Sequence, residues 1–600
     1  MKVKKIFASL LAVLLILASV SACGNQNKTN TQTEETTDAP IDTTPVEVED
    51  EGIDFWVQNN AGFENAVIGD EADFQVVWTE SIPEKVQIVS YTGTQEHLII
   101  PAEILGKSVT SIADGAFAEN LTLKTLIIPN SVTSIGKGIL AGCETLHSLQ
   151  TPLMGESKEG TQYLGYLFGA ATHEDNARDI PVSLKCLRLT ADWQTLPAYA
   201  LFDCNDIICL SLPENVTIIE KFAIYNGASL RQIDGIEKIV TFGDRALMNC
   251  SDLQIVTLGK DLETVGFGAF EGCNSIRTMT LPFVGRSQTE NTYLGYIFGA
   301  AQPDFAEGFY PAHLERITLS GACNALGNYA FFECETLKEI TLPEGLLSIG
   351  EYALKECAMQ TIKIPKTVQS IGKYAFYECE KLRSIDIPEG ITAIESYTFS
   401  YCTRLAIAKL PSSLTKIGYS SFQKSGLEQV VVPAGVTSIG DYAFEECTKL
   451  KSVVLPEGLQ SIGVYAFCDC VELTGVKIPT SIKRLSAHAF AGCEKLIQVE
   501  NGVHYVDKWV VKCEKNVTEV VLREDTVGIA DSACQLANAL KRITLPNGLQ
   551  YIGEHGLNSG YTLEQIIYDG TRLEWEGVQK GDDWCNDPIG LVFFARRTED

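Results

Sequence analysis

The stretch from Ile371 to Pro388, IGKYAFYECEKLRSIDIP, holds the pattern that decides the fold of this 600-residue chain. Its opening apolar residue returns along most of the sequence in steps of 22 or 23. The clearest copies begin at Leu326, Ile349, Ile371, Ile394, Ile417, Ile439, Ile462 and Leu485, and weaker ones at Ile112, Ile135, Leu196, Ile219, Phe242, Val265, Ile529 and Ile552. A period in this range is typical of a solenoid, whose coils bury their apolar faces only against neighbouring coils.

Each coil combines two local patterns. Ile385 and Ile387 alternate with Asp386 and stop at a proline, which predicts a short strand with two inward side chains. Ala375, Phe376 and Cys379 stand at i, i+1 and i+4, which predicts one face of a helical turn. We therefore predict an α/β fold of roughly 23-residue coils, each with one short strand and one short helix or 3₁₀ turn, and with the strands stacked in parallel.

A block of several coils is duplicated, because TQYLGYLFGA at 161–170 returns as NTYLGYIFGA at 291–300. Each copy carries an insertion, near 155–180 and near 285–310, that interrupts the register and is expected to bulge from the solenoid. The candidate insertion contacts are Tyr163, Tyr166, Phe168, Tyr293, Tyr296 and Phe298. The alternative is that these rings pin the insertion against the solenoid edge. The longer interval between Leu485 and Ile529 predicts one degenerate coil.

Eleven of the 19 cysteines share one position of the repeat. They are Cys143, Cys204, Cys250, Cys273, Cys334, Cys357, Cys379, Cys402, Cys447, Cys470 and Cys493. Gly227 and Ser425 take the same position in two other coils, which indicates a narrow buried slot. We expect free buried thiols there, since a buried cysteine behaves as a small hydrophobe. One cysteine per coil is also the wrong spacing for zinc, so no metal is predicted.

The N-terminus has the features of an export signal: Lys2, Lys4 and Lys5 precede an apolar run and then small residues. Cys23 directly follows Ala22, as in a bacterial lipobox, so we predict a lipoprotein signal peptide over 1–22 and acylation of Cys23. The alternatives are ordinary cleavage near Ala22 or a retained membrane anchor. Residues 23–52 are rich in Thr, Asn and acidic residues and predict a disordered acidic tether.

The formal net charge of −30 argues against nucleic acid and anionic lipid as partners, because binding phosphate requires a basic patch. The seven histidines are scattered, and neither a metal-ligand motif nor a nucleophile motif occurs. We therefore predict no enzyme activity, no catalytic residue and no cofactor.

The outward positions of the predicted strands form a candidate binding surface. Its residues are Thr341, Lys363, Asp386, Ile407, Lys409, Val431, Val454 and Lys477. Mixed charge with a small aliphatic patch suits a protein partner, whereas the absence of aromatic residues in these rows disfavours a long glycan. The alternative is an ordinary solvated sheet face.

The repeat resembles the leucine-rich repeats of BspA-type bacterial surface proteins of the treponemal class, which implies a curved leucine-rich repeat solenoid. The resemblance extends to an entry segment at 91–110 and a C-terminal closing hairpin at 568–575. It gives an N-terminal cap and entry segment at 53–110, a solenoid at 111–565 and a C-terminal cap at 566–600. The family is associated with binding of host matrix proteins or other cells.

These observations together predict a lipid-anchored protein exposed at the bacterial cell surface, whose solenoid binds an extracellular or host protein or another cell. The membrane is contacted only through the lipid. The alternatives are a surface lipoprotein that captures nutrients or glycans, and a structural spacer of the envelope. The sequence indicates no oligomeric state.

Overall fold

The computed structural model describes residues 63–79, 84–190, 192–290, 292–321, 323–585 and 592–596. Contacts divide the chain into Met1–Ile53 and Asp54–Asp600, and only the second unit contains described residues. The predicted signal peptide, Cys23 and the predicted tether at 23–52 lie outside the described residues.

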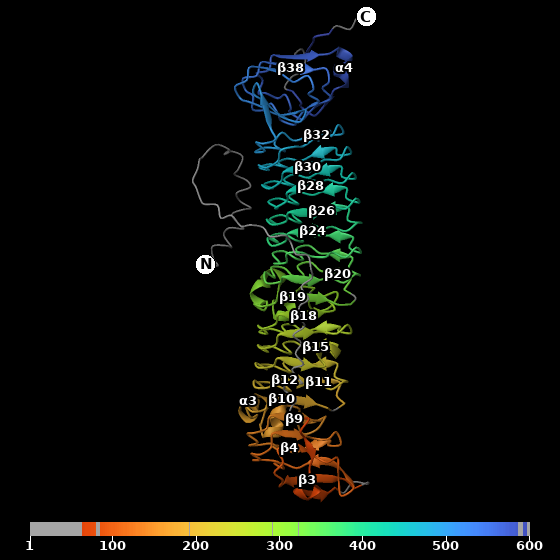
Figure 1. The fold of residues 1–600 in the computed structure, drawn as a ribbon, viewed down its shortest axis with the longest axis vertical. Helices are drawn as coiled ribbons and strands as arrows, with labels where there is room; N and C mark the ends of the chain where they lie inside the picture. Colours follow the sequence, from red (N-terminus) through yellow and green to blue (C-terminus); the bar gives the residue numbers. More distant parts are fainter. Residues whose placement is uncertain are drawn as a thin grey trace. The chain divides into compact units, whose positions relative to one another are not determined.

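The second unit is a parallel-strand solenoid with few helices, as predicted, and Figure 1 shows its coils stacked one upon the next. Neighbouring strands pair in parallel with equivalent residues in register; Ser384 lies beside Ile407, and Asp386 beside Lys409. The first row of strands is β4 (His97–Ile99), β7 (Thr125–Ile127), β9 (Ser148–Thr151), β10 (Cys186–Leu189), β12 (Cys209–Ser211), β14 (Gln232–Asp234), β16 (Ile255–Thr257), β18 (Thr278–Leu281), β19 (Arg316–Leu319), β21 (Glu339–Thr341), β24 (Ser384–Asp386), β26 (Ile407–Lys409), β28 (Gln429–Val431) and β30 (Ser452–Val454).

Most coils also have a second strand, usually of two residues, that was not predicted from the sequence. It ends at the opening apolar residue of the repeat, such as Ile394 or Ile417, which is buried. This row is β6 (Lys107–Ile112), β8 (Ser134–Ile135), β11 (Thr195–Leu196), β13 (Ile218–Ile219), β15 (Thr241–Phe242), β17 (Thr264–Val265), β20 (Ala325–Leu326), β22 (Ser348–Ile349), β23 (Ser370–Ile371), β25 (Ala393–Ile394), β27 (Lys416–Ile417), β29 (Ser438–Ile439), β31 (Ser461–Ile462) and β32 (Arg484–Leu485).

The predicted helical turn at 372–379 is instead a run of tight turns. Tyr374 and Glu378 have φ values of 57° and 59°, in the left-handed region that a right-handed helix excludes. The N–H groups of Tyr374, Phe376 and Glu378 donate to carbonyls of the next coil at 2.9–3.1 Å, and the intervening N–H groups close local turns. The backbone is thus satisfied between coils rather than along a helix axis.

The glycine that follows the opening residue in most coils lets adjacent coils approach closely. A Cβ added at Gly372 would lie 2.7 Å from the Glu351 nitrogen and 2.8 Å from the Gly350 carbonyl carbon of the preceding coil. Because those atoms belong to backbone, they have little freedom to move away. A side chain at this position would therefore obstruct the bend.

The core is a continuous column of stacked side chains. Phe376, Phe399, Phe422 and Phe444 are buried, and successive ring centroids lie 5.2–5.4 Å apart. Phe467 and Phe490 continue the column. Each ring therefore contacts mainly the coils directly before and after it, as expected for a repeat array.

Each insertion was predicted to bulge from the solenoid. The structure differs from this prediction, because part of each insertion continues the stack of coils. The first contains η4 (Leu164–Phe168), η5 (His173–Asp175) and α3 (Asn176–Asp179), and the second η7 (Leu294–Phe298), η8 (Pro303–Phe305) and η9 (Glu307–Phe309). Gly138 and Leu140 donate to the carbonyls of Tyr166 and Leu167, and Leu164 donates to Ala200. The three equivalent bonds recur in the second copy of the duplicated block. The segments η4 and η7 therefore replace the turn of a coil, which satisfies the backbone on both sides.

The ends of the repeat array have different pairing. At the N-terminal end β1 (Val67–Ile68) pairs with β4, while β2 (Phe74–Trp78), which follows η3 (Glu71–Asp73), runs antiparallel to β3 (Val86–Tyr91). The predicted degenerate coil after Leu485 is wrong in part, because β33 (Gln498–Glu500), β34 (Val503–Val506) and β35 (Trp509–Cys513) form an antiparallel meander there. Further along, β35 is the parallel partner of β37 (Gly528–Ile529).

The expected C-terminal closing hairpin is also not observed among the described residues. Instead β40 (Gln565–Asp569) continues a parallel row between β38 (Arg542–Pro546) and β42 (Val592–Phe594), and α4 (Arg572–Gly577) follows it. The Thr571 and Glu574 side chains form a capping box at the start of α4. The same region holds β36 (Glu519–Val521), β39 (Tyr551–Ile552) and β41 (Gln579–Lys580).

The eleven cysteines of the repeat are buried free thiols, as predicted. Their side chains also have a role that the sequence did not show: Cys379, Cys402 and Cys447 donate to backbone carbonyls of the preceding coil at 3.0–3.1 Å. Burial raises the pKa of the Cys379 thiol to about 12. Because the thiolate is the reactive form, the Cys379 thiol is unreactive at neutral pH.

Candidate binding surface

All eight residues of the predicted binding surface are exposed. Six lie on strands of the first row, from β21 to β30. Lys363 and Lys477 occupy the same position in coils in which no strand is formed there. The regular spacing of parallel strands thus places equivalent side chains side by side, about 4.8 Å apart.

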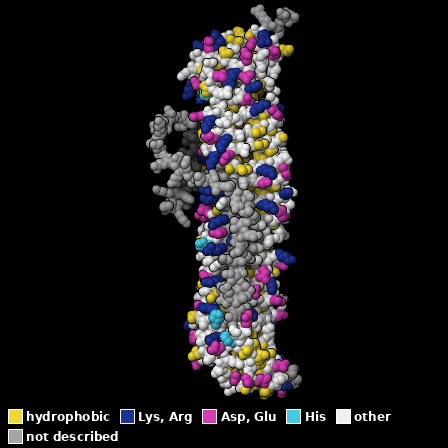
Figure 2. Space-filling model, in the orientation of Figure 1, with side chains coloured by type: hydrophobic (Ala, Val, Ile, Leu, Met, Phe, Trp, Pro, Cys, Tyr) yellow, Lys and Arg dark blue, Asp and Glu magenta, His cyan; other side chains and the backbone are white. Residues whose placement is uncertain are grey.

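The aliphatic part of this surface is a defined patch of three residues, Ile407, Val431 and Val454, hereafter the aliphatic patch. Their side chains are 59%, 65% and 56% exposed, and Val431 and Val454 are register partners. Figure 2 shows hydrophobic side chains gathered over these strands. Exposed β-branched side chains in adjacent rungs give an apolar area that a partner can cover.

Charged side chains border the aliphatic patch. The Lys409 ammonium, on β26 beside the patch, lies 3.2 Å from the Asp386 carboxylate on β24. A second exposed pair lies one coil beyond β24, where the Lys363 ammonium is 2.7 Å from Glu344. Such exposed ion pairs contribute little to stability. They can instead orient a charged partner, since their charges lie at the surface.

The aromatic residues of the insertions are not arranged as a surface for a partner. Phe168, Tyr293, Tyr296 and Phe298 are buried, and Tyr163 and Tyr166 are partly buried. The hydroxyls of Tyr163 and Tyr293 donate to the Ala170 and Ala300 carbonyls at 3.1 Å and 3.0 Å. These contacts fit the packing alternative, in which the rings hold the insertions against the solenoid.

Aromatic residues do form a surface row elsewhere, on the tight turns rather than on the strands. Tyrosines at the fourth position of the repeat, with Tyr419 one position earlier in its coil, form a row with centroid distances between 4.5 Å and 5.4 Å. Most neighbouring rings are stacked, whereas Tyr419 is tilted against both of its neighbours. The row is Tyr329, Tyr352, Tyr374, Tyr397, Tyr419, Tyr442 and Tyr465, and His488 continues it. The recurring Tyr-Ala-Phe of the repeat could have indicated this tyrosine row. The side of the coil on which the tyrosines lie, however, depends on their left-handed backbone conformation.

A group of carboxylates lies beside this row. Lys355 is half-buried and bonds to both Glu333 and Glu356. Burial, together with a hydrogen bond and like-charge repulsion from Glu356, raises the pKa of Glu378 to about 7. The two carboxyl groups of Glu356 and Glu378 therefore share a proton near neutral pH.

We expect this pair to make stability depend on pH. Between the ordinary pKa of a glutamate and about 7, the folded protein holds a proton at Glu378 that the unfolded chain has released. The contribution of this group to stability therefore falls as pH rises through that window. Denaturant midpoints at pH 5 and pH 8 should differ less in Glu378→Gln than in the unmodified protein.

The matched control for this experiment is Glu344→Gln, because the Lys363 ammonium holds the pKa of that exposed carboxyl below its ordinary value. Its titration therefore lies at lower pH than that of an ordinary glutamate, and the variant should keep the original difference between the two midpoints. An unchanged difference in Glu378→Gln would contradict the shared proton.

Within the described residues, no group of three or more His, Cys, Asp or Glu side chains is placed to hold a metal ion. In that same part of the chain, no helix is long and apolar enough to cross a bilayer. The described coils are thus an extended scaffold of exposed rows, which is a class of fold that generally presents binding surfaces rather than catalytic pockets.

The family model for the BspA type leucine rich repeat region matches residues 87–159, 181–293, 306–428, 415–513 and 466–574. The matches cover more than half of the sequence, so the chain belongs to the BspA-type leucine-rich repeat family. The comparison with curated proteins finds no match.

The solved structures that this chain matches include bacterial leucine-rich repeat proteins. One from Bacteroides ovatus is 18% identical, covers 89% of this chain and 100% of its own, and has a TM-score of 0.26. A leucine rich cell surface protein from Faecalibacterium prausnitzii is 18% identical over 85% of this chain and 97% of its own, with a TM-score of 0.22. The T. pallidum leucine rich repeat protein is 16% identical over 53% of this chain and 91% of its own, with a TM-score of 0.17.

Proposed function

We propose that this protein is a lipid-anchored bacterial cell-surface protein that binds an extracellular protein or another cell through the strand face of its solenoid. The proposal rests chiefly on one observation, the aliphatic patch on β26, β28 and β30, exposed and bordered by ion pairs. An apolar centre with a polar rim is the usual organisation of a protein interface. Membership of the BspA-type family supports the same role.

Anchoring is proposed from the sequence around Cys23, where acylation would attach the chain to the membrane. The acidic segment 23–52 would then separate the solenoid from the bilayer, because a chain of that length and composition spans roughly 30 Å on average. The strand face would be left free to meet a partner outside the cell.

The test is a triple variant of the aliphatic patch, Ile407→Ser, Val431→Ser and Val454→Ser, displayed as the full chain on cells. The cells are applied to an array of immobilised extracellular matrix proteins. We expect at least a tenfold loss of binding to any retained protein, because a tenfold change corresponds to about 1.4 kcal/mol and each apolar contact removed contributes at this scale.

The matched control carries the same change at three equally exposed aliphatic residues outside the patch: Ile255→Ser, Val499→Ser and Val521→Ser. It should bind like the unmodified protein. Equal loss in both variants would show that the effect is general rather than local. If the array retains no cells at all, or if the patch variant binds normally, the proposed role of this face is wrong.

A further inference from the structure

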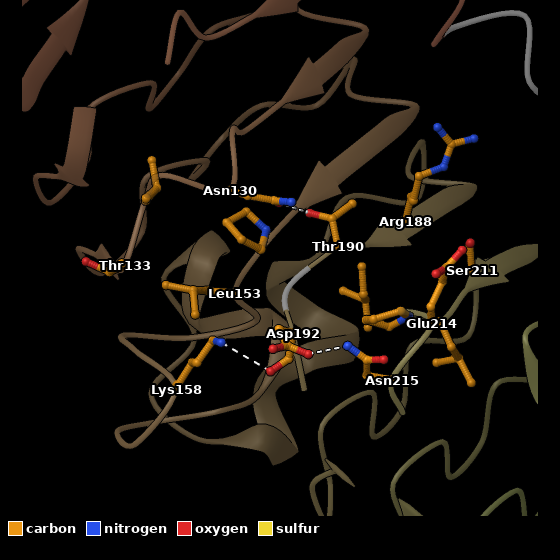
Figure 3. A pocket seen from close by; sticks show the side chains of 15 residues that line it. Asn130, Thr133, Leu153, Lys158, Arg188, Thr190, Asp192, Ser211, Glu214 and Asn215 are labelled. Atoms are coloured by element: carbon orange, nitrogen blue, oxygen red, sulfur yellow. Dashed lines mark hydrogen bonds between the residues drawn. The ribbon is translucent and has the colours of Figure 1, made fainter. Parts of the chain in front are cut away.

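A pocket of about 590 Å³ lies where the first insertion leaves the solenoid (Figure 3). One wall comes from the insertion and carries Leu153 and Lys158, and the other comes from β10 and the segment that follows β12. The volume is in the range of sites for small ligands. This pocket is separate from the aliphatic patch, which lies several coils further along on β26, β28 and β30.

The floor of the pocket is aliphatic and its rims are polar. Leu153, Leu189 and Leu212 are buried and line the floor. On one rim the Thr190 hydroxyl donates to the Asn130 side chain at 2.6 Å. Figure 3 shows this bond and the opposite rim, which lies across the cavity.

The opposite rim is a chain of charged and amide groups centred on Asp192. The Lys158 ammonium donates to the Asp192 carbonyl oxygen at 3.2 Å, and the Asn215 amide donates to the Asp192 carboxylate. The lysine thus reaches from the insertion to the neighbouring coil and keeps two further N–H donors. This bond holds the exposed Lys158 ammonium at the mouth of the pocket.

The pocket presents both signs of charge at its rim. Lys158 and Arg188 are cationic, while Asp192 and Glu214 are anionic. Arg188 also lies over the Phe63 ring at 4.5 Å and contacts Gln150, so its position is fixed by its neighbours. A balanced set of charges disfavours phosphates and nucleic acid, which need an excess of cations, and fits a ligand that itself carries both charges.

The duplicated block shows that the fold does not require this lining. In its second copy, Leu153 corresponds to Phe283, Lys158 to Gln288, and Arg188 to Thr318. Phe283 and Gln288 instead line a different cavity of about 10 Å³, together with Cys323 and Gly327, whose counterparts do not line the first pocket. The side chains at these three lining positions therefore differ between the two copies of the block.

We propose that this pocket binds a short peptide with free ends. The carboxylate end would lie against Lys158, the ammonium end against Asp192 or Glu214, and an aliphatic side chain on the leucine floor. Charge-assisted hydrogen bonds of this kind are the strongest that such a rim can make. A sugar is disfavoured, because none of the described lining residues is an aromatic ring on which a pyranose could stack.

The experiment measures saturation-transfer NMR and dissociation constants for the purified full chain with trialanine and trileucine, each with free ends and with acetylated and amidated ends. Maltotriose serves as the sugar probe. The variants are Leu153→Phe and Lys158→Gln, which introduce residues that the second copy of the block already carries. Gln288→Lys, in that second copy, is the matched control.

We expect saturation transfer to the free-ended peptides and not to maltotriose. Blocking the ends, or either variant, should weaken binding by about tenfold or more, since each removes a charged contact or fills the floor. Gln288→Lys should leave binding unchanged. Lys158 is exposed, so its variant tests the proposal even where Leu153→Phe disturbs the fold.

The proposal is overturned by any of three results. The first is the absence of saturation transfer to every peptide, and the second is binding that neither end-blocking nor Lys158→Gln weakens. The third is binding of maltotriose without peptide binding, which would assign the pocket to a sugar. None of these results affects the role proposed for the aliphatic patch, because that surface is tested by different variants.

Discussion

Replacing Phe376 with alanine should lower the free energy of unfolding of its coils by about 3–5 kcal/mol, the range typical of a buried phenylalanine. The ring is completely buried and stacks on Phe399 with a centroid distance of 5.2 Å. The rigid backbone of tight turns on either side leaves little room for the coils to collapse into the space. The loss includes both the buried apolar area and the cavity that remains.

The effect should be local, because each coil contacts mainly its two neighbours. Hydrogen exchange in Phe376→Ala should rise first between Ile349 and Ile417 and stay low near Ile112 and Ile135. The matched control is Phe305→Ala, whose side chain is 66% exposed on η8 and should change stability little. A uniform rise over all coils, or no rise near Phe376, would show that the coil is not the packing unit.

Replacing Cys23 with alanine should release the protein from the membrane fraction or leave an unprocessed precursor. The thiol of Cys23 is the predicted site of acylation, and each buried methylene of an acyl chain contributes about 0.8 kcal/mol to membrane binding. Two or more chains hold a protein stably where one does not. Loss of the thiol therefore removes the whole anchor rather than weakening it.

The measurement for Cys23→Ala is membrane fractionation together with metabolic labelling by a radioactive fatty acid. Ser21→Ala is a suitable control, because it exchanges one small residue for another beside the predicted cleavage point and should keep both label and attachment. If Cys23→Ala stays in the membrane fraction with unchanged label, the lipoprotein prediction is wrong.

The spacing of the repeat predicted the stacking of the coils and the core residues well. Buried positions require apolar side chains, so they are visible in the sequence as recurring apolar residues. Phe376 and Cys379 are buried where the pattern placed them. The conformation of the turn between them was not predictable from spacing alone. Residues at i, i+1 and i+4 lie on one side of a helix, but they also face inward in tight turns whose alternate N–H groups bond to the next coil.

The insertions and the cysteines show the same limit. Spacing indicated that residues 155–180 interrupt the register, yet η4 restores it through bonds to Gly138 and Leu140. The disulfide between Cys513 and Cys534 was not predicted, since neither residue occupies the ladder position. Disulfide pairing depends on which segments lie close together in the folded chain, and this cannot be deduced from a single sequence.

The exposure of the strand face proposed as a binding surface was predictable from the sequence, but other exposed features of the solenoid were not. The outward phase of the strands correctly gave Asp386 and Val431 as exposed. The pocket near Lys158 was missed, because its walls come from an insertion and from coils that are distant from it in the sequence. The tyrosine row was missed as a surface, because left-handed backbone at Tyr374 sets its direction.

Because of the cysteine ladder, closure of the coils during folding competes with oxidation of the thiols. An open chain exposes thiols that an oxidant can join in wrong pairs, and such exchange takes seconds to hours. Each coil that carries a ladder cysteine buries its thiol when it closes, as Cys379 does by donating to the Leu354 carbonyl. Closure of such a coil therefore protects its thiol from oxidation. In an oxidising compartment, the yield of correct protein would then be set by how quickly the first few coils form. A reducing or anaerobic habitat would remove that pressure.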